Sequence, residues 1–432
     1  MTHRFRQADV HAFTWTASPD YLTASDRLEV DGLPPVDITL LYQPEHAHQV
    51  DRHFHATKAA LEHYGRWFGP YPYGHLTVVD PAWGAGAGGM EYPTIFTSGT
   101  RWLNPFGGGS PESVTIHEAG HQFWYGIVGN NEFEHAWIDE GFNSFSDARV
   151  YDVTYGPEMY VKRYFRPPGT RSSGFFPVLF EDLLLGRDVW GNRMSRFRDH
   201  ATTEVMSRPT FRYFPSKAGH LSYTKTALWL ATLERHLGWE TLQEILSTFF
   251  TRFSYAHPTP GDFFATVDEV SGRSMVWFFD RVYRDSGHFD YAVESITTRP
   301  LDLRGLIDTP EGPAPREGPD ESAGPSPTYR SEVVIRRNGD GVFPVEILLV
   351  FADGSESRHA WDGRRRWTMV VEERPAALAW AEVDPDRVLL LDVDRTNNSR
   401  TLTPGDDFVA TQIASRWIVW LQDFLMSFAF FT

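Results

Sequence analysis

Hydrophobic and polar positions repeat with different periods along the chain, and each period predicts a kind of element. From Val10 to Tyr42 apolar and polar residues alternate between turn residues, which is typical of β-strands. Residues 48–67 instead have the spacing of a helix. LTVV at 76–79, and TIFTS after a glycine-rich run, predict two further strands. Helical spacing then dominates from Pro111 to Tyr283, so we expect β structure followed by a mainly helical region.

The chain changes character after this helical region. The segment from Pro300 to Pro327 is rich in proline, glycine, serine and acids and has almost nothing to bury, which indicates a linker. From Tyr329 to Val393 alternating runs (EVVIRR, VEILLVF and RWTMVV) are separated by NGDG, ADGS and WDGR turns. This pattern predicts a small β-module of the sandwich type.

The last apolar stretch, from Trp417 to Phe431, is interrupted by Gln422 and Asp423. It is shorter than the roughly 20 apolar residues that cross a bilayer. We therefore expect a docked terminal helix, with an interfacial membrane anchor as the alternative. Membrane association is expected only through this helix.

Composition limits the class of protein. The 432 residues are 41% hydrophobic and 15% aromatic, which predicts a folded chain of about three domains. Lysine and arginine number 40 against 57 acids, and the net charge of −17 argues against a nucleic acid partner. The absence of cysteine leaves histidine, aspartate and glutamate as the strong metal ligands. Residues 1–10 lack the apolar stretch of a secretory signal, so we expect a cytoplasmic protein, or an extracytoplasmic one if an N-terminal region is missing.

The segment SPESVTIHEAGHQF carries a metal-binding pattern. Ser110 as N-cap and Pro111 at the first helical position predict a helix that runs through His117, Glu118 and His121. A spacing of four residues places both imidazoles on one face of the helix, where they can bind one cation.

A third ligand follows in AWIDEGFNSF, where Glu140 comes 18 residues after the second histidine. Glycines and asparagines break the first helix, and Ile138 to Val150 can form a second helix whose first turn presents Glu140. Two histidines, one carboxylate and one open position are the ligand set of a hydrolytic zinc site. Alternatively, the three are polar surface positions. Asp147, on the same helical face as Glu140, either orients a liganding imidazole or is a surface acid.

HEAGH, the 18-residue gap, WIDEGF and the upstream GGMEYP together resemble the zinc aminopeptidases (gluzincins) related to alanyl aminopeptidase and the leukotriene-hydrolysing aminopeptidases. The resemblance covers most of the chain. It implies that His117, His121 and Glu140 bind one zinc ion per chain and that Glu118 is the general base. Chemistry agrees, because zinc lowers the pKa of a bound water and a neighbouring carboxylate can take its proton.

Gly88, Gly89, Met90 and Glu91 resemble the G-x-M-E-N signature of this family, with Tyr92 in place of asparagine. The resemblance implies that Glu91 binds the free α-amine of the substrate. A carboxylate near zinc pairs with an α-ammonium only at a chain terminus. It therefore allows one residue of the substrate before the bond that is cleaved. The glycines allow the peptide backbone to approach. Without the resemblance, the same residues indicate only a structural turn.

A later tyrosine completes the expected site. HLSYTKTALWL is similar to the Tyr-x-Lys stretch of the family, which implies that Tyr223 stabilises the oxyanion, with Tyr213 as the fallback. On its own, a tyrosine on an apolar helix usually packs in the core. Lys225 is expected to be a surface or supporting charge.

Taken together, the pattern and the resemblance predict an α+β multidomain chain. We expect the end of an apparently truncated N-terminal β domain, a thermolysin-like, mainly helical catalytic domain, a linker, a β-sandwich module and a terminal apolar helix, at residues 1–45, 46–299, 300–328, 329–400 and 401–432.

The expected function is that of a zinc aminopeptidase that acts on peptides with a free N-terminus. One alternative is an endopeptidase, because a missing domain leaves the cleft open at both ends. Another is a catalytically silent interaction module of the same fold, although such a module need not retain Glu118, which is not itself a ligand. The preferred N-terminal residue and the oligomeric state are not predicted.

Overall fold

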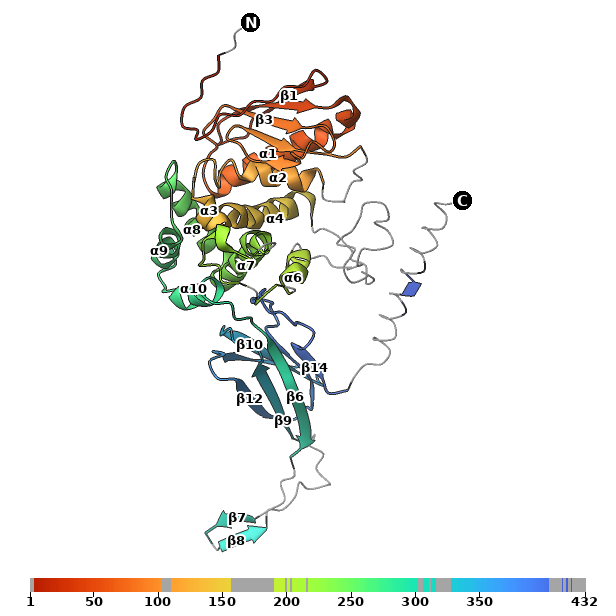
Figure 1. The fold of residues 1–432 in the computed structure, drawn as a ribbon. Helices are drawn as coiled ribbons and strands as arrows, with labels where there is room; N and C mark the ends of the chain where they lie inside the picture. Colours follow the sequence, from red (N-terminus) through yellow and green to blue (C-terminus); the bar gives the residue numbers. More distant parts are fainter. Residues whose placement is uncertain are drawn as a thin grey trace. The chain divides into compact units, whose positions relative to one another are not determined.

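The computed structural model describes residues 4–102, 110–156, 190–198, 200–202, 204–214, 217–301, 306–310, 312–315 and 328–403, together with 414, 417, 418 and 421. The chain divides into two compact units, Met1–Ser286 and Gly287–Thr432 (Figure 1). In the described residues the first unit contains helices and one sheet, whereas the second is built mainly of strands.

The first unit begins with a five-stranded sheet in the order β1-β2-β3-β5-β4. Its strands are, in chain order, β1 (Leu22–Leu28), β2 (Val36–Tyr42), β3 (His75–Asp80), β4 (Gly89–Met90) and β5 (Ile95–Ser98). Strands β2, β3 and β5 are parallel, while β1 and β4 run antiparallel to their neighbours. Because β4 is an edge strand, its outer side pairs with no other described strand.

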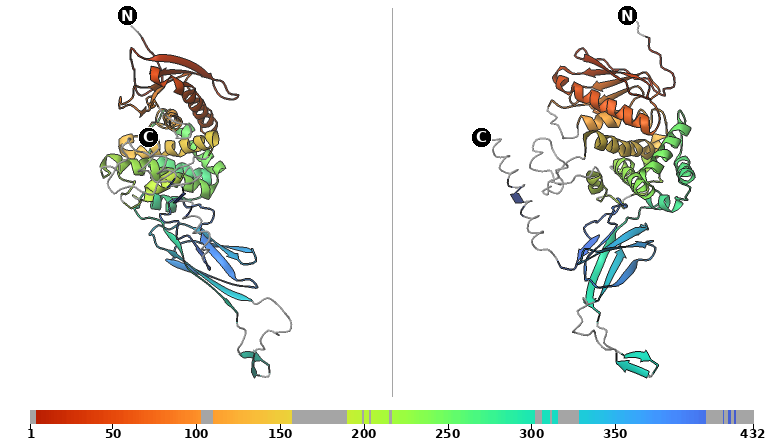
Figure 2. Two further views of the ribbon diagram at one scale, coloured as in Figure 1. Left: turned by 90° about the vertical axis from the view of Figure 1, so that its right-hand side faces the viewer. Right: turned by 180° about the vertical axis from the view of Figure 1, so that it is seen from behind.

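Helices pack beneath this sheet, as the views of Figures 1 and 2 show. The first two are the short 3-10 turn η1 (Pro44–Gln49) and α1 (Val50–Trp67). The central group is α2 (Glu112–Gly120), α3 (Glu132–Ala136), the π-helical turn η2 (Trp137–Gly141) and α4 (Phe142–Tyr155). The rest are α6 (Gly191–Arg198), η3 (Thr210–Arg212), the π-helical turn η4 (His220–Lys225), α7 (Thr226–Leu237), α8 (Trp239–Phe253), α9 (Pro260–Ser271) and α10 (Val276–Val282). Helix α2 packs against α1 and α4, and α4 against α7.

Large aromatic side chains fill the space between these helices. Trp137, at the start of η2, is fully buried, and its ring centroid lies 5.5 Å from that of Trp229 and 5.8 Å from that of Phe142. Aromatic side chains of this size each bury a large apolar area. The packing therefore anchors the π-helical turn on which Glu140 lies.

Two details of the predicted helices differ from the structure. Ser110 is not the N-cap of α2: the cap position is Pro111, with no side-chain cap, and the Arg52 guanidinium instead donates to the Ser110 carbonyl at 2.8 Å and pairs with Glu112. The second helical segment begins at Glu132, earlier than Ile138, because Asn131 starts α3 and the turn η2 joins it to α4.

The second unit contains two antiparallel sheets. One has the order β12-β9-β6 and the other β11-β10-β13-β14. Their strands are β6 (Tyr291–Pro300), β9 (Tyr329–Arg337), β10 (Val345–Phe351), β11 (Glu356–Trp361), β12 (Trp367–Arg374), β13 (Leu378–Val383) and β14 (Ser399–Thr401). Alternate residues of the central strands are almost fully buried, among them Val333, Ile335, Ile347 and Leu349. The strands that the alternating runs predict are therefore present.

Two short strands lie within the proline-rich segment. β7 (Leu306–Thr309) and β8 (Gly312–Pro315) pair as an antiparallel hairpin. The terminal helix expected at 401–432 lies almost wholly outside the described residues. The described positions between 404 and 432 are helical: Ala414, Trp417, Ile418 and Leu421. Among the helices of the described ranges, none combines the length and the apolar character needed to cross a bilayer.

Candidate metal centre

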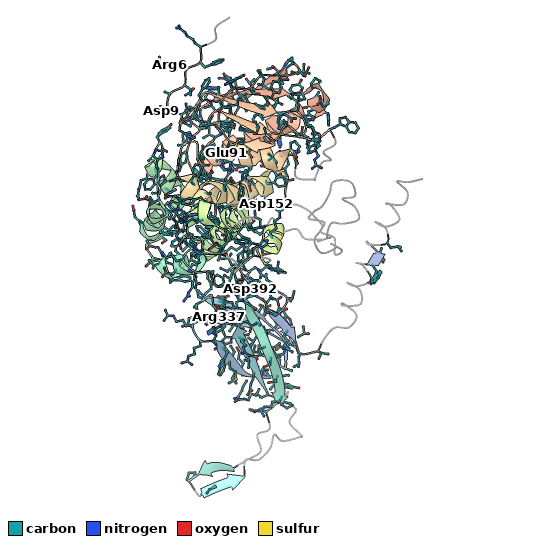
Figure 3. All side chains as sticks on the ribbon, in the orientation of Figure 1. Arg6, Asp9, Glu91, Asp152, Arg337 and Asp392 are labelled. Atoms are coloured by element: carbon teal, nitrogen blue, oxygen red, sulfur yellow. The ribbon has the colours of Figure 1, made fainter. Side chains whose placement is uncertain are left out.

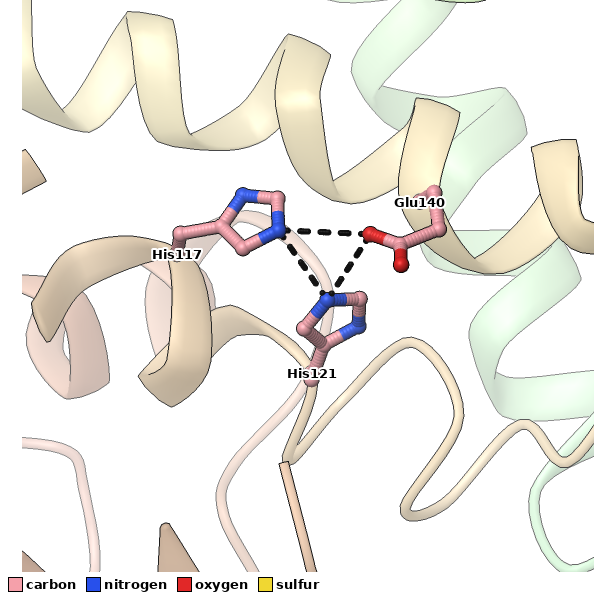
Figure 4. A group of neighbouring side chains, drawn as sticks. All are labelled: His117, His121 and Glu140. Atoms are coloured by element: carbon pink, nitrogen blue, oxygen red, sulfur yellow. Dashed lines mark hydrogen bonds and ion pairs between the residues drawn. The ribbon is translucent and has the colours of Figure 1, made fainter. Parts of the chain in front are cut away.

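The three predicted ligands converge in the first unit. His117 lies in α2, His121 directly follows α2, and Glu140 projects from η2 (Figure 4). The two imidazole Nε2 atoms are 3.1 Å apart, and they lie 3.3 Å and 3.2 Å from Glu140 Oε2. Ligand atoms bound at 2.0–2.1 Å to a tetrahedral zinc ion are about 3.3 Å apart. The three atoms, which we call the metal centre, therefore have the spacing that one zinc ion requires.

The outer nitrogens of both imidazoles face acids. His117 Nδ1 is 2.8 Å from Asp147 Oδ2, and His121 Nδ1 is 2.5 Å from Asp139 Oδ1. His121 Nδ1 also lies 3.2 Å from the Trp124 carbonyl oxygen, which can accept its proton. A proton on each Nδ1 leaves the Nε2 lone pairs directed at each other and at Glu140. Three converging acceptors need a cation between them, so the donor chemistry also fits a metal ion.

The pKa values of these groups reflect the same arrangement. Burial lowers the pKa of His117, but the hydrogen bonds to Asp147 and Glu140 outweigh it and raise the pKa to about 10. Burial alone would raise the pKa of Glu140, yet the two imidazoles hold it well below its usual range. The Glu140 carboxyl is therefore ionised, as a metal ligand must be.

Glu118 lies beside the metal centre and exposes only 6% of its surface. Burial raises the pKa of its carboxyl to about 7. Its Oε2 atom is buried and has no hydrogen-bond partner in the described part of the chain. A Cβ atom added at Gly89 would collide with Glu118 Oε1, so a larger residue there would displace the Glu118 carboxylate.

The segment Gly88–Glu91 lies beside Glu118. Gly89 pairs with Ser98 and Met90 with Thr97, and Glu91 follows β4 directly, beside α2 (Figure 3). Glu91 exposes 9% of its surface. Ligand atoms of Glu91, Glu118 and His121 lie within 4.8 Å of one another. The structure thus brings the predicted amine anchor next to the predicted base, while Gly88 supports the loop by accepting a hydrogen bond from the Gly99 amide at 2.7 Å.

Tyr223 also reaches the metal centre. It lies on η4, its hydroxyl donates to Glu140 Oε1, and its ring stacks on His117 with the centroids 5.8 Å apart. Tyr213, the fallback, is buried and donates to the Met206 carbonyl at 2.8 Å. Of the two tyrosines, Tyr223 is the one that contacts the predicted ligands His117 and Glu140.

Similar proteins were found by sequence. Aminopeptidase M1-D and Aminopeptidase M1-A of Oryza sativa subsp. japonica are 25% identical over 164 residues and 26% identical over 165 residues, each match covering 38% of this chain and 16% of the relative. Leucine aminopeptidase 2 of Aspergillus clavatus is 24% identical over 201 residues, which cover 46% of this chain and 29% of the relative. The resemblance to the aminopeptidases is confirmed.

A solved structure shares the fold. The crystal structure of Legionella pneumophila aminopeptidase A in complex with aspartic acid matches with a TM-score of 0.56 at 13% identity, over 86% of this chain and 38% of that chain. No family model matches the sequence. The matches with the curated relatives span only 16% to 29% of the length of those proteins.

Sequence reasoning missed Asp139 as a functional residue and left Asp147 undecided. Asp139 lies beside Glu140 in WIDEGF, and its charge, acting against burial, holds the pKa of His121 well above its usual value. Asp147 both contacts His117 and accepts a hydrogen bond from Arg193 at 2.8 Å, so it orients the imidazole. Lys225, expected at the surface or in support, is buried.

Proposed function

We propose that this protein is a zinc aminopeptidase that hydrolyses the N-terminal bond of peptides. The observation that carries the proposal is the convergence of His117, His121 and Glu140 at the spacing of zinc ligands, with Glu118 and Glu91 beside them. The likeness to aminopeptidases supports the same reaction class.

The zinc ion would be held by His117, His121 and Glu140. When bound, zinc supplies Lewis acidity, which polarises a carbonyl group and acidifies water. Asp147 and Asp139 keep each imidazole in the tautomer that presents Nε2 to the metal centre.

Glu118 moves the proton in this proposal. Its Oε2 atom, which has no other partner among the described residues, accepts a proton from the attacking water and passes it to the departing amine nitrogen. A carboxyl whose pKa is raised to about 7 by burial can both accept and donate near neutral pH.

Two further groups act on the substrate. The Tyr223 hydroxyl donates a hydrogen bond to the carbonyl oxygen as negative charge develops there. Glu91 binds the α-ammonium, and the open edge of β4 pairs with the substrate backbone. Together they align the first peptide bond with Glu118.

Hydrolysis of a panel of aminoacyl-naphthylamides tests the proposal. We expect turnover that a chelator abolishes and that zinc restores, with no turnover of the N-acetylated forms. Equal turnover of acetylated peptides would indicate an endopeptidase instead. A zinc-loaded protein that hydrolyses none of the substrates would contradict peptidase activity.

A further inference from the structure

A third carboxylate lies beside the proposed amine anchor. Glu132 is the first residue of α3, 11 residues after His121. Carboxylate oxygens of Glu91, Glu132 and Asp139 lie within 4.8 Å of one another. Neither the metal centre nor the proton transfer described above uses Glu132.

The negative charge of this group of acids is balanced only in part by neighbouring side chains. Asp139 already faces His121 Nδ1 at 2.5 Å, which leaves Glu91 and Glu132. Glu91 is nine-tenths buried, and no residue in the described ranges hydrogen-bonds to its carboxylate. Glu132 is half-buried. Two neighbouring carboxylates repel each other, and a cation between them removes this cost.

The position of the group favours one kind of cation. In a peptide the α-nitrogen lies about 2.5 Å from the carbonyl carbon of its own residue, so an amine subsite must adjoin the catalytic base. Glu91 meets this condition, because it also forms a group within 4.8 Å with Glu118 and His121. The terminal nitrogen of a lysine side chain would lie on the order of 6 Å farther out. An α-ammonium has three N–H donors to share among such oxygens.

We propose that Glu132 is a second anionic residue of the amine subsite and holds the substrate α-ammonium together with Glu91. The inference rests on the proposed aminopeptidase function and adds to it a substrate-binding residue from the start of α3, directly after the loop that follows the two histidines. This loop connects the end of α2 to α3.

Tyr125 lies beside Glu132. Burial raises the pKa of the Tyr125 hydroxyl, and the Glu132 carboxylate is close enough to raise it further. Its backbone φ of 103° lies in the left-handed region, which is strained for a tyrosine. The amide of Tyr125 bonds to the Val128 carbonyl at 3.0 Å, and the His11 ring contacts the tyrosine edge-on at 4.6 Å. The surroundings therefore hold Tyr125 in a conformation that reaches Glu132.

The test compares Glu132→Gln with Glu134→Gln, a matched control on the same short helix whose side chain is 50% exposed. For leucyl-naphthylamide we expect Glu132→Gln to raise KM about 10- to 100-fold, because the variant loses one charge-assisted hydrogen bond to the substrate. We expect kcat to change far less. Glu134→Gln should leave both constants as in the wild type.

Direct binding separates the amine contact from other effects. Titration calorimetry with leucinamide should show the same 10- to 100-fold weakening in Glu132→Gln. Binding of 4-methylpentanamide, which lacks the amine, should not change. Tyr125→Phe should raise KM in the wild-type background and have no further effect in the Glu132→Gln background, since it acts through Glu132.

Each remaining outcome is decisive. If the wild type hydrolyses the substrate and Glu132→Gln binds leucinamide equally well, the inference is wrong and the proposed function stands. If the wild type hydrolyses nothing, the proposed function fails, and the calorimetric comparison still decides whether Glu132 binds an amine. If the wild type binds two zinc ions per chain and Glu132→Gln binds one, the acids hold a second metal ion and not an ammonium group, and the inference is wrong.

Discussion

Each imidazole of the metal centre is supported from behind by an acid. Asp147 faces His117, and Asp139 faces His121. Such acids fix the tautomer and the orientation of a ligand and raise its basicity. The zinc affinity of the metal centre should therefore depend on residues that would not themselves touch the metal.

Replacing Asp147 tests this support. Asp147→Asn should weaken zinc binding about 10- to 100-fold, because the neutral amide no longer stabilises the Nδ1 proton of His117. Competition with a chromophoric chelator measures the affinity. Asp152→Asn, an exposed position on the same helix, is the control, and an unchanged zinc affinity in Asp147→Asn would remove Asp147 from the site.

In the proposed mechanism Glu118 acts on the proton and not on the metal. Glu118→Gln should therefore keep stoichiometric zinc while turnover of aminoacyl-naphthylamides falls by several orders of magnitude. Elemental analysis and steady-state kinetics on one preparation measure both quantities. Retention of wild-type turnover would exclude Glu118 as the base.

At the scale of elements, two π-helical turns meet at the site. Glu140 lies on η2 and Tyr223 on η4, and the turns pack against each other. Gly141 permits this approach, because a Cβ atom there would collide with the side chain of Thr226 and the Ser222 carbonyl. π-helical turns are rare and often occur at functional sites, where they redirect side chains.

Gly141→Ala should push η2 and η4 apart. We expect a loss of about 1–3 kcal/mol in the free energy of unfolding, the usual cost of overpacking, together with weaker zinc binding. Denaturant titration and chelator competition measure the two effects. Gly219→Ala is the control, since Gly219 has helical backbone angles and open space at its Cβ position. Equal stability of the two variants would show that the turns tolerate separation.

At the scale of the molecule, the first unit supplies all of the proposed site. Its residues come from β4, α2, α3, η2, α4 and η4 or directly follow these elements, so they assemble only when sheet and helices pack together. The same packing buries Lys225, which exposes 3% of its surface and whose Nζ atom has no hydrogen-bond partner among the described residues. A buried, unpaired ammonium reduces the stability of the unit.

Burial lowers the pKa of Lys225 to about 8. The folded-state pKa is below the unfolded value of about 10.4, so this residue's contribution to stability is complete above the unfolded value and is lost as the pH falls through 8. Lys225→Met should therefore raise the free energy of unfolding at pH 7 by roughly 1–3 kcal/mol. The advantage over the wild type should shrink between pH 8 and 10. A constant difference across this range would contradict the assignment.

Local periodicity determined much of this protein. The four-residue spacing of His117 and His121 places them one helical turn apart whatever the rest of the chain does, and alternation over Tyr329–Arg337 predicts the strand that forms there. Glu140 needed more than periodicity, because its approach depends on how one helix returns past another. The family-like motifs supplied that information.

Only the tertiary structure shows which acids lie at the proposed site. Asp139, Asp147 and Glu132 resemble surface acids in the sequence, and Ser110 resembles a helix cap that the fold does not use. The sequence did not predict the burial of Lys225 either. The physical reason is that a contact between side chains of different elements depends on their packing distance, which no local pattern of residues encodes.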